Sequence, residues 1–156
     1  MKKGISLIIL TTTIVIMAIL ITTITISGIQ TANSSKKITF ATEIASIQDA
    51  VDAYKIKMNG EYPIGESIVV NTSNLSVAAV TQFAGDISAA GESLVLEKID
   101  YSKIGITSLK YGYKKNGAND VYAVSTTTGK VYYVSGLSIG TKKYFTLTDD
   151  LKSSIS

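Results

Sequence analysis

An uncharged N-terminal segment constrains this chain more than any other feature. After Lys2 and Lys3, no charged side chain occurs from Gly4 to Ser35. In a helix rising about 1.5 Å per residue, the stretch from Ile5 to Ile29 is longer than the roughly 30 Å hydrocarbon core of a bilayer. The segment therefore predicts a membrane-crossing helix, with the basic N-terminus in the cytoplasm and the bulk of the chain outside.

A conventional cleaved signal peptide fits this segment poorly. Such a signal has an apolar core of about 7–15 residues, followed by small residues at the first and third positions before the cut. Here the uncharged run is longer, and cleavage after Ala32 or Gly28 would place Gln30 or Ile26 at the third position. A retained anchor is therefore favoured.

Composition excludes several classes of function. The 156 residues include 15 Lys and Arg against 12 Asp and Glu, and two of these cations are Lys2 and Lys3. The remaining chain is close to neutral, which argues against a nucleic-acid partner. The chain has neither Cys nor His. Thiolate or imidazole metal sites, a cysteine nucleophile and a Ser-His-Asp triad are therefore excluded.

The pattern after the uncharged segment predicts that the helix continues as an amphipathic half. Between Lys36 and Met58, apolar side chains recur at alternating spacings of four and three, which is one stripe of a helix. These are Phe40, Ile44, Ile47, Val51, Tyr54 and Met58, with Glu43, Asp49, Asp52, Lys55 and Lys57 largely off the stripe. We expect the stripe to face a soluble domain.

The end of this helix is marked in the sequence. Asn59 and Gly60 tolerate the left-handed backbone that ends helices, and Pro63 follows shortly after. No proline occurs before it. The simplest interpretation is one continuous helix from about Ile5 to Met58, about 80 Å long.

These residues carry a resemblance to a known family. Lys-Lys-Gly, an uncharged span and an amphipathic helix ending in "DAVDAYKIKMNGEYP" resemble the type IV pilin and type II secretion pseudopilin superfamily. The second stretch is especially similar to the major pseudopilins, with Tyr54 on the last helical turns before an exit at Asn59, Gly60, Tyr62 and Pro63. The resemblance covers about the first sixty residues well and the rest only in architecture.

The resemblance implies a processing and assembly route. A prepilin peptidase would cut after Gly4 and the amine of Ile5 would be methylated, so 1–4 is a leader and 5–35 is the transmembrane or filament-core half. Residues 36–58 form the amphipathic half and 59–156 the globular head. The subunit would stay in the cytoplasmic membrane, in contact with lipid, until an assembly platform and its ATPase extract it. It would then pack with copies of itself and other pilin subunits in a cell-surface filament.

One position departs from the family pattern. Members usually carry Glu five residues into the mature chain, where its carboxylate is thought to pair with the terminal amine of a neighbouring subunit. Here that position is Ile9. Either hydroxyls such as those of Ser6 and Thr11 solvate the amine, or this subunit occupies a place, such as a filament tip, where no pairing is needed.

The C-terminal part is expected to be mixed helix and strand, which makes the whole an α+β ladle. "SNLSVAAVTQFAG" predicts a short helix, with Ser73 or Asn74 as N-cap and Gly85 as its stop. Four strands are expected, at about 108–114, 120–126, 130–135 and 142–148. "TTTGK" predicts a hairpin turn in which Gly129 needs positive φ. The short connections favour an antiparallel sheet with one face over the helical stripe.

Three features invite a chemical interpretation. A Gly-containing loop holds Asn116, Asn119 and Asp120, which are candidate Ca²⁺ ligands together with the acids at 149–150 near the C-terminus. The alternative is an ordinary turn whose Asn and Asp side chains form hydrogen bonds with the backbone. Asp49 and Asp52, near Lys55, are read as a solvated face and not as an acid/base pair. A tyrosine cluster could form a binding platform or simply pack a sheet, and it comprises Tyr111, Tyr113, Tyr122, Tyr132, Tyr133 and Tyr144.

Three classes of function remain. A structural subunit of a pilus or secretion pseudopilus, without catalysis or a required cofactor, is the leading hypothesis. A single-pass membrane protein whose outer domain binds a ligand and never polymerises is the alternative. A membrane-tethered enzyme is least favoured, because no nucleophile-base pair or metal cluster can be assembled from the sequence.

Overall fold

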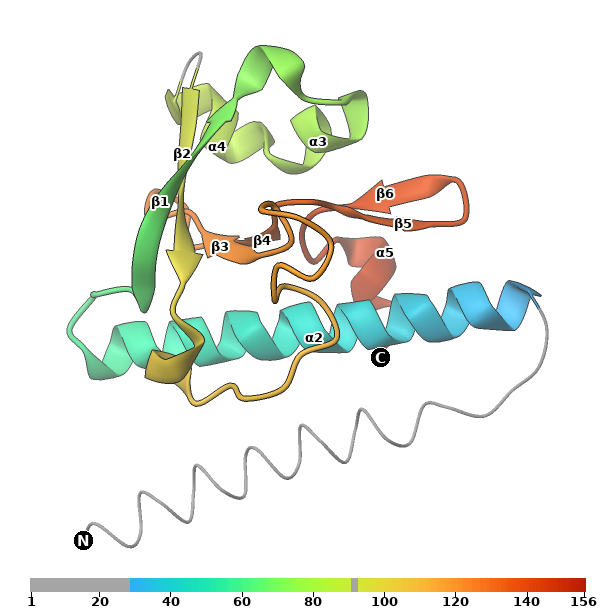
Figure 1. Ribbon diagram of the computed structural model, residues 1–156, viewed down its shortest axis with the longest axis horizontal. Helices are drawn as coiled ribbons and strands as arrows, with labels where there is room; N and C mark the ends of the chain where they lie inside the picture. Colours follow the sequence, from blue (N-terminus) through green and yellow to red (C-terminus); the bar gives the residue numbers. More distant parts are fainter. Residues whose placement is uncertain (1–28, 91–92) are drawn as a thin grey trace, which may run out of the picture.

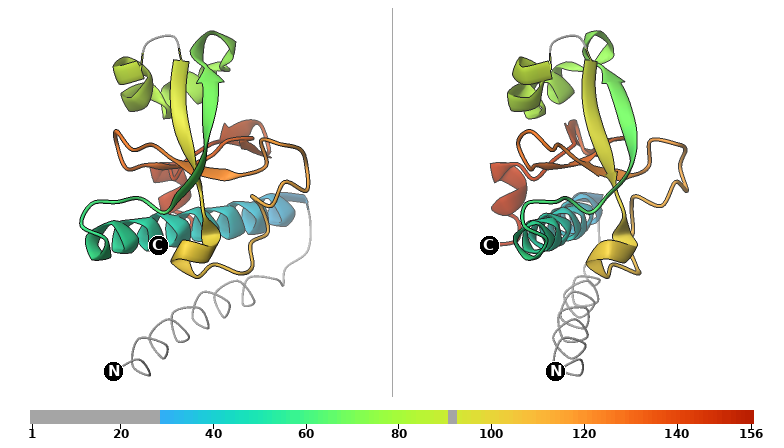
Figure 2. Two further views of the ribbon diagram at one scale, coloured as in Figure 1. Left: turned by 60° about the vertical axis from the view of Figure 1, so that its left-hand side comes forward. Right: turned by 90° about the vertical axis from the view of Figure 1, so that its left-hand side faces the viewer.

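A long helix carries a small head on one side. The computed structural model describes residues 29–90 and 93–156. Helix α2 (Ile29–Lys57) runs along the base of Figure 1, and nearly all the remaining elements lie above it. The right-hand view of Figure 2 looks nearly along α2 and shows the same division.

The head contains an antiparallel sheet. Strands β1 (Ile64–Asn71), β2 (Ser93–Ile99), β3 (Tyr122–Val124) and β4 (Val131–Tyr133) pair in the order β1-β2-β3-β4. A separate hairpin is formed by β5 (Leu137–Ile139) and β6 (Lys142–Tyr144). The expected α+β class, a helix with an antiparallel sheet, is confirmed.

Short helices complete the head. A 3₁₀ turn (Thr72–Asn74), α3 (Val77–Gln82) and α4 (Ala84–Ala90) lie between β1 and β2. A second 3₁₀ turn (Tyr101–Ile104) follows β2, and α5 (Asp149–Lys152) lies near the C-terminus. The predicted helix in this region is therefore split, and its predicted ends are wrong. Ser76 caps α3 by accepting from the Ala79 N–H, and Gly85 lies inside α4.

The sheet separates two apolar clusters. On the α2 side, Tyr122 and Val124 of β3 pack with the helix stripe, which is fully buried at Phe40, Ile44, Ile47 and Val51. On the other side, Ala123 and Tyr132 belong to a second buried cluster. Its other members are Ala79 of α3, Leu94 and Leu96 of β2, and Phe83 and Phe145. Burying each large apolar side chain contributes about 1.5–3 kcal/mol, so the stripe fixes the head on α2. The stripe ends earlier than predicted, because Met58 is 39% exposed.

The strand predictions are partly confirmed. β3, β4 and β6 lie within the predicted ranges, and the hairpin pairs Val124 with Val131, with Gly129 at φ +75°. The strand predicted at 108–114 is wrong, because this segment is irregular and its N–H groups bond to side chains. β1, β2 and β5 were not predicted.

The predictions for the leader and most of the membrane segment fall outside the described residues. These are the cleavage and methylation sites at Gly4 and Ile5, the replaced position Ile9, and the helix before 29. Within the described part of the chain, no helix is both long and apolar enough to cross a bilayer.

Candidate functional site: the junction of helix α2 with the head

The helix exit has the predicted left-handed geometry. Asn59 and Gly60 have φ of +55° and +99°, and the Gly60 N–H donates to the Lys55 carbonyl at 2.8 Å. This bond over five residues closes a Schellman-type C-cap, which satisfies a carbonyl that the helix leaves free. Lys55 and Lys57 in the last turn complement the helix dipole.

The residues after the exit anchor the chain to the head. Lys55 Nζ donates to the Tyr62 hydroxyl at 2.7 Å and lies 4.7 Å from the centre of its ring. Pro63 is buried, and its carbonyl accepts from the Asp100 N–H. The structure therefore brings Asn59, Gly60, Tyr62 and Pro63 into one turn, while Tyr54 is half-buried one helical turn earlier.

Gln48 joins the middle of α2 to the hairpin between β3 and β4. Its Nε2 donates to the Gly129 carbonyl at 2.9 Å and its Oε1 accepts from the Val131 N–H at 2.8 Å. Both ends of one amide are thus used on one hairpin. Asp49 and Asp52 lie exposed on α2, as the sequence predicted.

Glu43 is the most buried charged group on the helix, with 2% exposure. Its carboxylate accepts from the N–H groups of Lys110 and Tyr111 and from the hydroxyl of Tyr122, at 2.6, 3.1 and 2.6 Å. Burial raises the pKa of Glu43, and these hydrogen bonds offset part of that rise. The carboxylate pins the irregular 105–120 loop, which runs along one flank of α2 in Figure 1.

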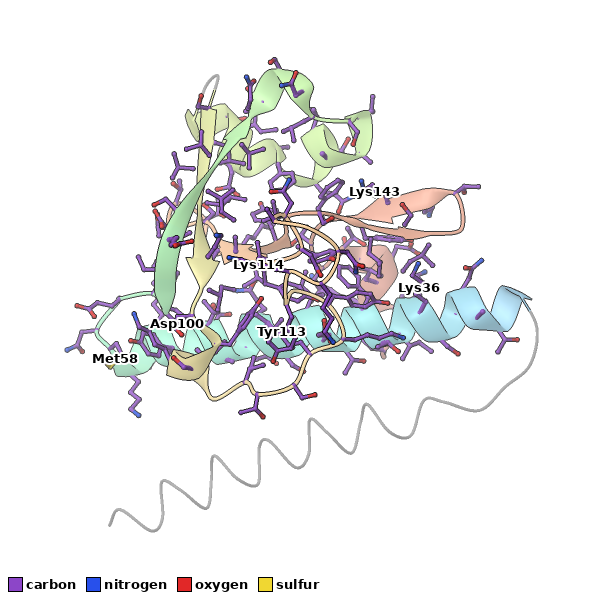
Figure 3. All side chains as sticks on the ribbon, viewed as in Figure 1. Lys36, Met58, Asp100, Tyr113, Lys114 and Lys143 are labelled. Atoms are coloured by element: carbon purple, nitrogen blue, oxygen red, sulfur yellow. The ribbon has the colours of Figure 1, made fainter. Side chains whose placement is uncertain are left out.

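A second set of contacts holds the N-terminal half of α2. Lys37 Nζ donates to Asp150 at 2.8 Å, Asp150 also accepts from the Tyr144 hydroxyl, and Lys36 Nζ donates to the Ser138 carbonyl at 2.7 Å. Figure 3 marks Lys36 and, near the other end of α2, Met58. The hydrogen bond from Lys37, and then that from Tyr144, lower the pKa of Asp150 to about 2.

The three calcium candidates lie in different surroundings. Asn116 and Asn119 are exposed, whereas Asp120 is 1% exposed. The Asp120 carboxylate accepts from the Gly112 and Asn116 N–H groups and from the Tyr133 hydroxyl, so its oxygens already face donors. Burial raises the pKa of Asp120, but these bonds outweigh it and hold the pKa below its ordinary value. Such a surrounding does not fit a Ca²⁺ ligand, and the described residues hold no cluster of three or more acids suited to a metal.

The tyrosine cluster mainly packs the sheet. Tyr122, Tyr132, Tyr133 and Tyr144 are buried, and each donates its hydroxyl to a carboxylate: Glu43, Asp86, Asp120 and Asp150 respectively. Burial raises the pKa of each of these tyrosines, so the hydroxyls stay protonated donors. Among the described side chains, no buried nitrogen or oxygen is without a partner.

Sequence reasoning missed the polar residues of this junction. Glu43 was placed off the helical stripe, yet it is three residues after Phe40 and four before Ile47, a spacing that puts it on the buried face. That spacing was the available signal. No local pattern marks Asp86 on α4, whose carboxylate accepts from Ser125, Thr128 and Tyr132 on the side of the sheet away from α2.

Comparisons of the chain with protein-family models, with curated proteins and with solved structures found no match. The candidate site is therefore described from its own geometry alone. At the junction, the buried carboxylate of Glu43 is held by three protein donors, and the contacts are those of an attachment between a helix and a head.

Proposed function

We propose that the chain is a structural subunit of a type IV pilus or a type II secretion-like pseudopilus, held in the membrane until it polymerises through its N-terminal helix. One observation carries the proposal. Helix α2 begins at Ile29, inside the uncharged segment, and is buried by the head along one side, while its other side faces solvent. Ile56 on that outer side is 82% exposed.

The junction between α2 and the head supports this role. The head is attached at successive positions along α2, through Lys36, Lys37, Glu43, Gln48 and Lys55. The head is therefore attached along α2 from Lys36 to Lys55 and not at one end alone. The left-handed exit at Asn59 and Gly60, with Tyr62 and Pro63, fits the resemblance to major pseudopilins.

Blocking the predicted processing site tests the proposal. In the producing cells, Gly4→Leu should remove the chain from sheared surface material and leave it in membranes, because a bulky residue there would prevent cleavage. Lys115→Gln, an exposed change in the head, should leave the sheared fraction as in the wild type. Sheared material that is unaffected by Gly4→Leu, or a wild-type chain never found in sheared material, would contradict the proposal.

The alternative is a single-pass membrane-anchored domain that binds a ligand outside the membrane and does not polymerise. A small cavity beside Lys98 and Lys114 favours it. The fractionation above separates the two, because a protein of this kind would remain wholly in the membrane fraction.

A further inference from the structure

A cavity of about 200 Å³ lies where the 105–120 loop meets the end of strand β2. Its lining includes Lys98, Tyr101, Gly112, Tyr113, Lys114 and Val121. At about 30 Å³ of liquid per water molecule, the cavity has room for several waters or for one small organic molecule. Figure 3 labels Tyr113 and Lys114 on the loop that forms one wall.

The backbone of this wall is held in an uncommon conformation. Lys114 has φ of +59°, which is rare for a residue with a side chain, and its N–H donates to the Asp120 carbonyl at 2.7 Å. The Gly112 N–H donates to the Asp120 carboxylate, and its carbonyl accepts from the Tyr101 hydroxyl. Backbone strain of this kind persists only where surrounding contacts enforce it, and it is common at ligand sites.

Glycine is required at position 112 for the wall to approach the sheet. Gly112 has φ of +87°, and a Cβ there would lie 2.5 Å from a ring carbon of Tyr122. The same Cβ would lie 2.8 Å from the Tyr101 hydroxyl. The loop, Tyr101 and Tyr122 are therefore packed as one preformed surface.

Lys98 and Lys114 both line the cavity. Lys98 Nζ lies 2.8 Å from Glu66 Oε2, with Lys98 22% and Glu66 79% exposed at their side chains. The hydrogen bond and charge of Lys98 lower the pKa of Glu66, and the charge of Lys114 lowers it further. The two charged side chains that line the cavity are thus both lysines, and the carboxylate paired with Lys98 is exposed.

The remaining walls are aromatic and apolar. Tyr101 and Tyr113 meet edge to face with their ring centres 5.6 Å apart, and Ile99 and Val121 add aliphatic surface. Burial raises the pKa of Tyr101 to about 12, so its hydroxyl carries no charge near neutrality. The site therefore combines two lysines with uncharged aromatic and aliphatic walls.

We propose that this cavity binds a small organic anion, with its carboxylate or phosphate between Lys98 and Lys114 and its apolar body against Tyr101 and Tyr113. The anion would take over from Glu66, whose exposed side chain can swing into solvent. The proposal does not rest on polymerisation, because the site lies within one head.

The test uses the full ¹⁵N-labelled chain in a non-ionic detergent, with benzoate and phenyl phosphate as probes and benzamide as a neutral isostere of benzoate. Saturable shifts of the Gly112, Tyr113 and Lys114 amide signals are expected with at least one anion, and affinity for benzamide should be at least tenfold weaker. The stronger anion identifies carboxylate or phosphate as the preferred group. Signals that do not saturate with either anion, or equal affinity for benzamide, would overturn the proposal.

Variants locate the binding. Lys98→Gln with Lys114→Gln should weaken binding at least tenfold, whereas Lys115→Gln, an exposed lysine beside the cavity, should change it less than twofold. Unchanged amide signals of Ala123 and Tyr132 will show that each variant is folded. Equal losses in the double variant and in Lys115→Gln would mean that general charge attraction, and not this cavity, holds the anion.

Discussion

The hydroxyl of Tyr122 on strand β3 donates to the carboxylate of Glu43 on helix α2 at 2.6 Å, inside the core. Burial raises the pKa of Glu43, so its contribution to stability is greatest at low pH and is lost as pH rises through that raised value. Near neutrality, the carboxylate accepts three hydrogen bonds, one from the sheet and two from the 105–120 loop.

Glu43→Ala should therefore destabilise the protein by about 3 kcal/mol, because it leaves buried donors without an acceptor. Asp49→Ala, an exposed carboxylate on the same helix, should cost less than about 0.5 kcal/mol. Urea unfolding of the full chain in detergent, followed by circular dichroism, measures both. Equal losses would show that Glu43 does not pin the loop.

Gly112→Ala and Gly117→Ala form a matched pair in one loop. Both glycines have positive φ, but a Cβ at Gly112 would meet Tyr122 and Tyr101, while a Cβ at Gly117 meets nothing within 4 Å. We expect Gly117→Ala to cost about 1 kcal/mol from backbone strain and Gly112→Ala about 3 kcal/mol from strain plus overpacking. Thermal unfolding compares them, and a smaller loss for Gly112→Ala would refute the close packing.

Asp150 should make the stability of the fold depend on pH in the acidic range. Its pKa of about 2 in the fold lies below the ordinary 3.8, so its stabilising contribution is present above pH 3.8 and is lost as pH falls towards 2. The difference in urea midpoint between wild type and Asp150→Asn should be largest above pH 5 and should close near pH 2. A constant difference at all pH values would count against the Lys37 and Tyr144 contacts.

The helix exit predicts an order among substitutions at Asn59. Because Asn59 has φ of +55°, Asn59→Gly should change stability by no more than about 0.5 kcal/mol, whereas Asn59→Ala should lose about 1 kcal/mol. Lys57→Ala, the last residue of α2, is the control for changes at an exposed helix end. Thermal unfolding gives the order. If the Asn59→Ala variant were as stable as Asn59→Gly or more stable, the left-handed cap would be ruled out.

The sequence predicted what depends on local periodicity and turn chemistry. The stripe from Phe40 to Val51, the left-handed exit at Asn59 and Gly60, and the hairpin at Gly129 are all confirmed. Each rests on spacing within a few residues or on the φ that a residue tolerates.

The remainder depends on contacts between distant residues. The segment 108–114 has the composition of a strand, but Glu43 and Asp120 take up its N–H groups and hold it as a loop. β1 and β2 escaped prediction because exposed Val69 and Val95, which face each other across the pair, blur the alternation of apolar and polar residues. The cavity beside Lys98 and Lys114 likewise joins residues that only the fold brings together.

The most direct test of the filament proposal is the intact mass and N-terminal sequence of the chain from sheared surface material and, separately, from membranes. The account predicts a chain that begins at methylated Ile5 in the sheared fraction. A chain that begins at Met1 and occurs only in membranes would contradict the filament proposal and leave a membrane-anchored binding domain.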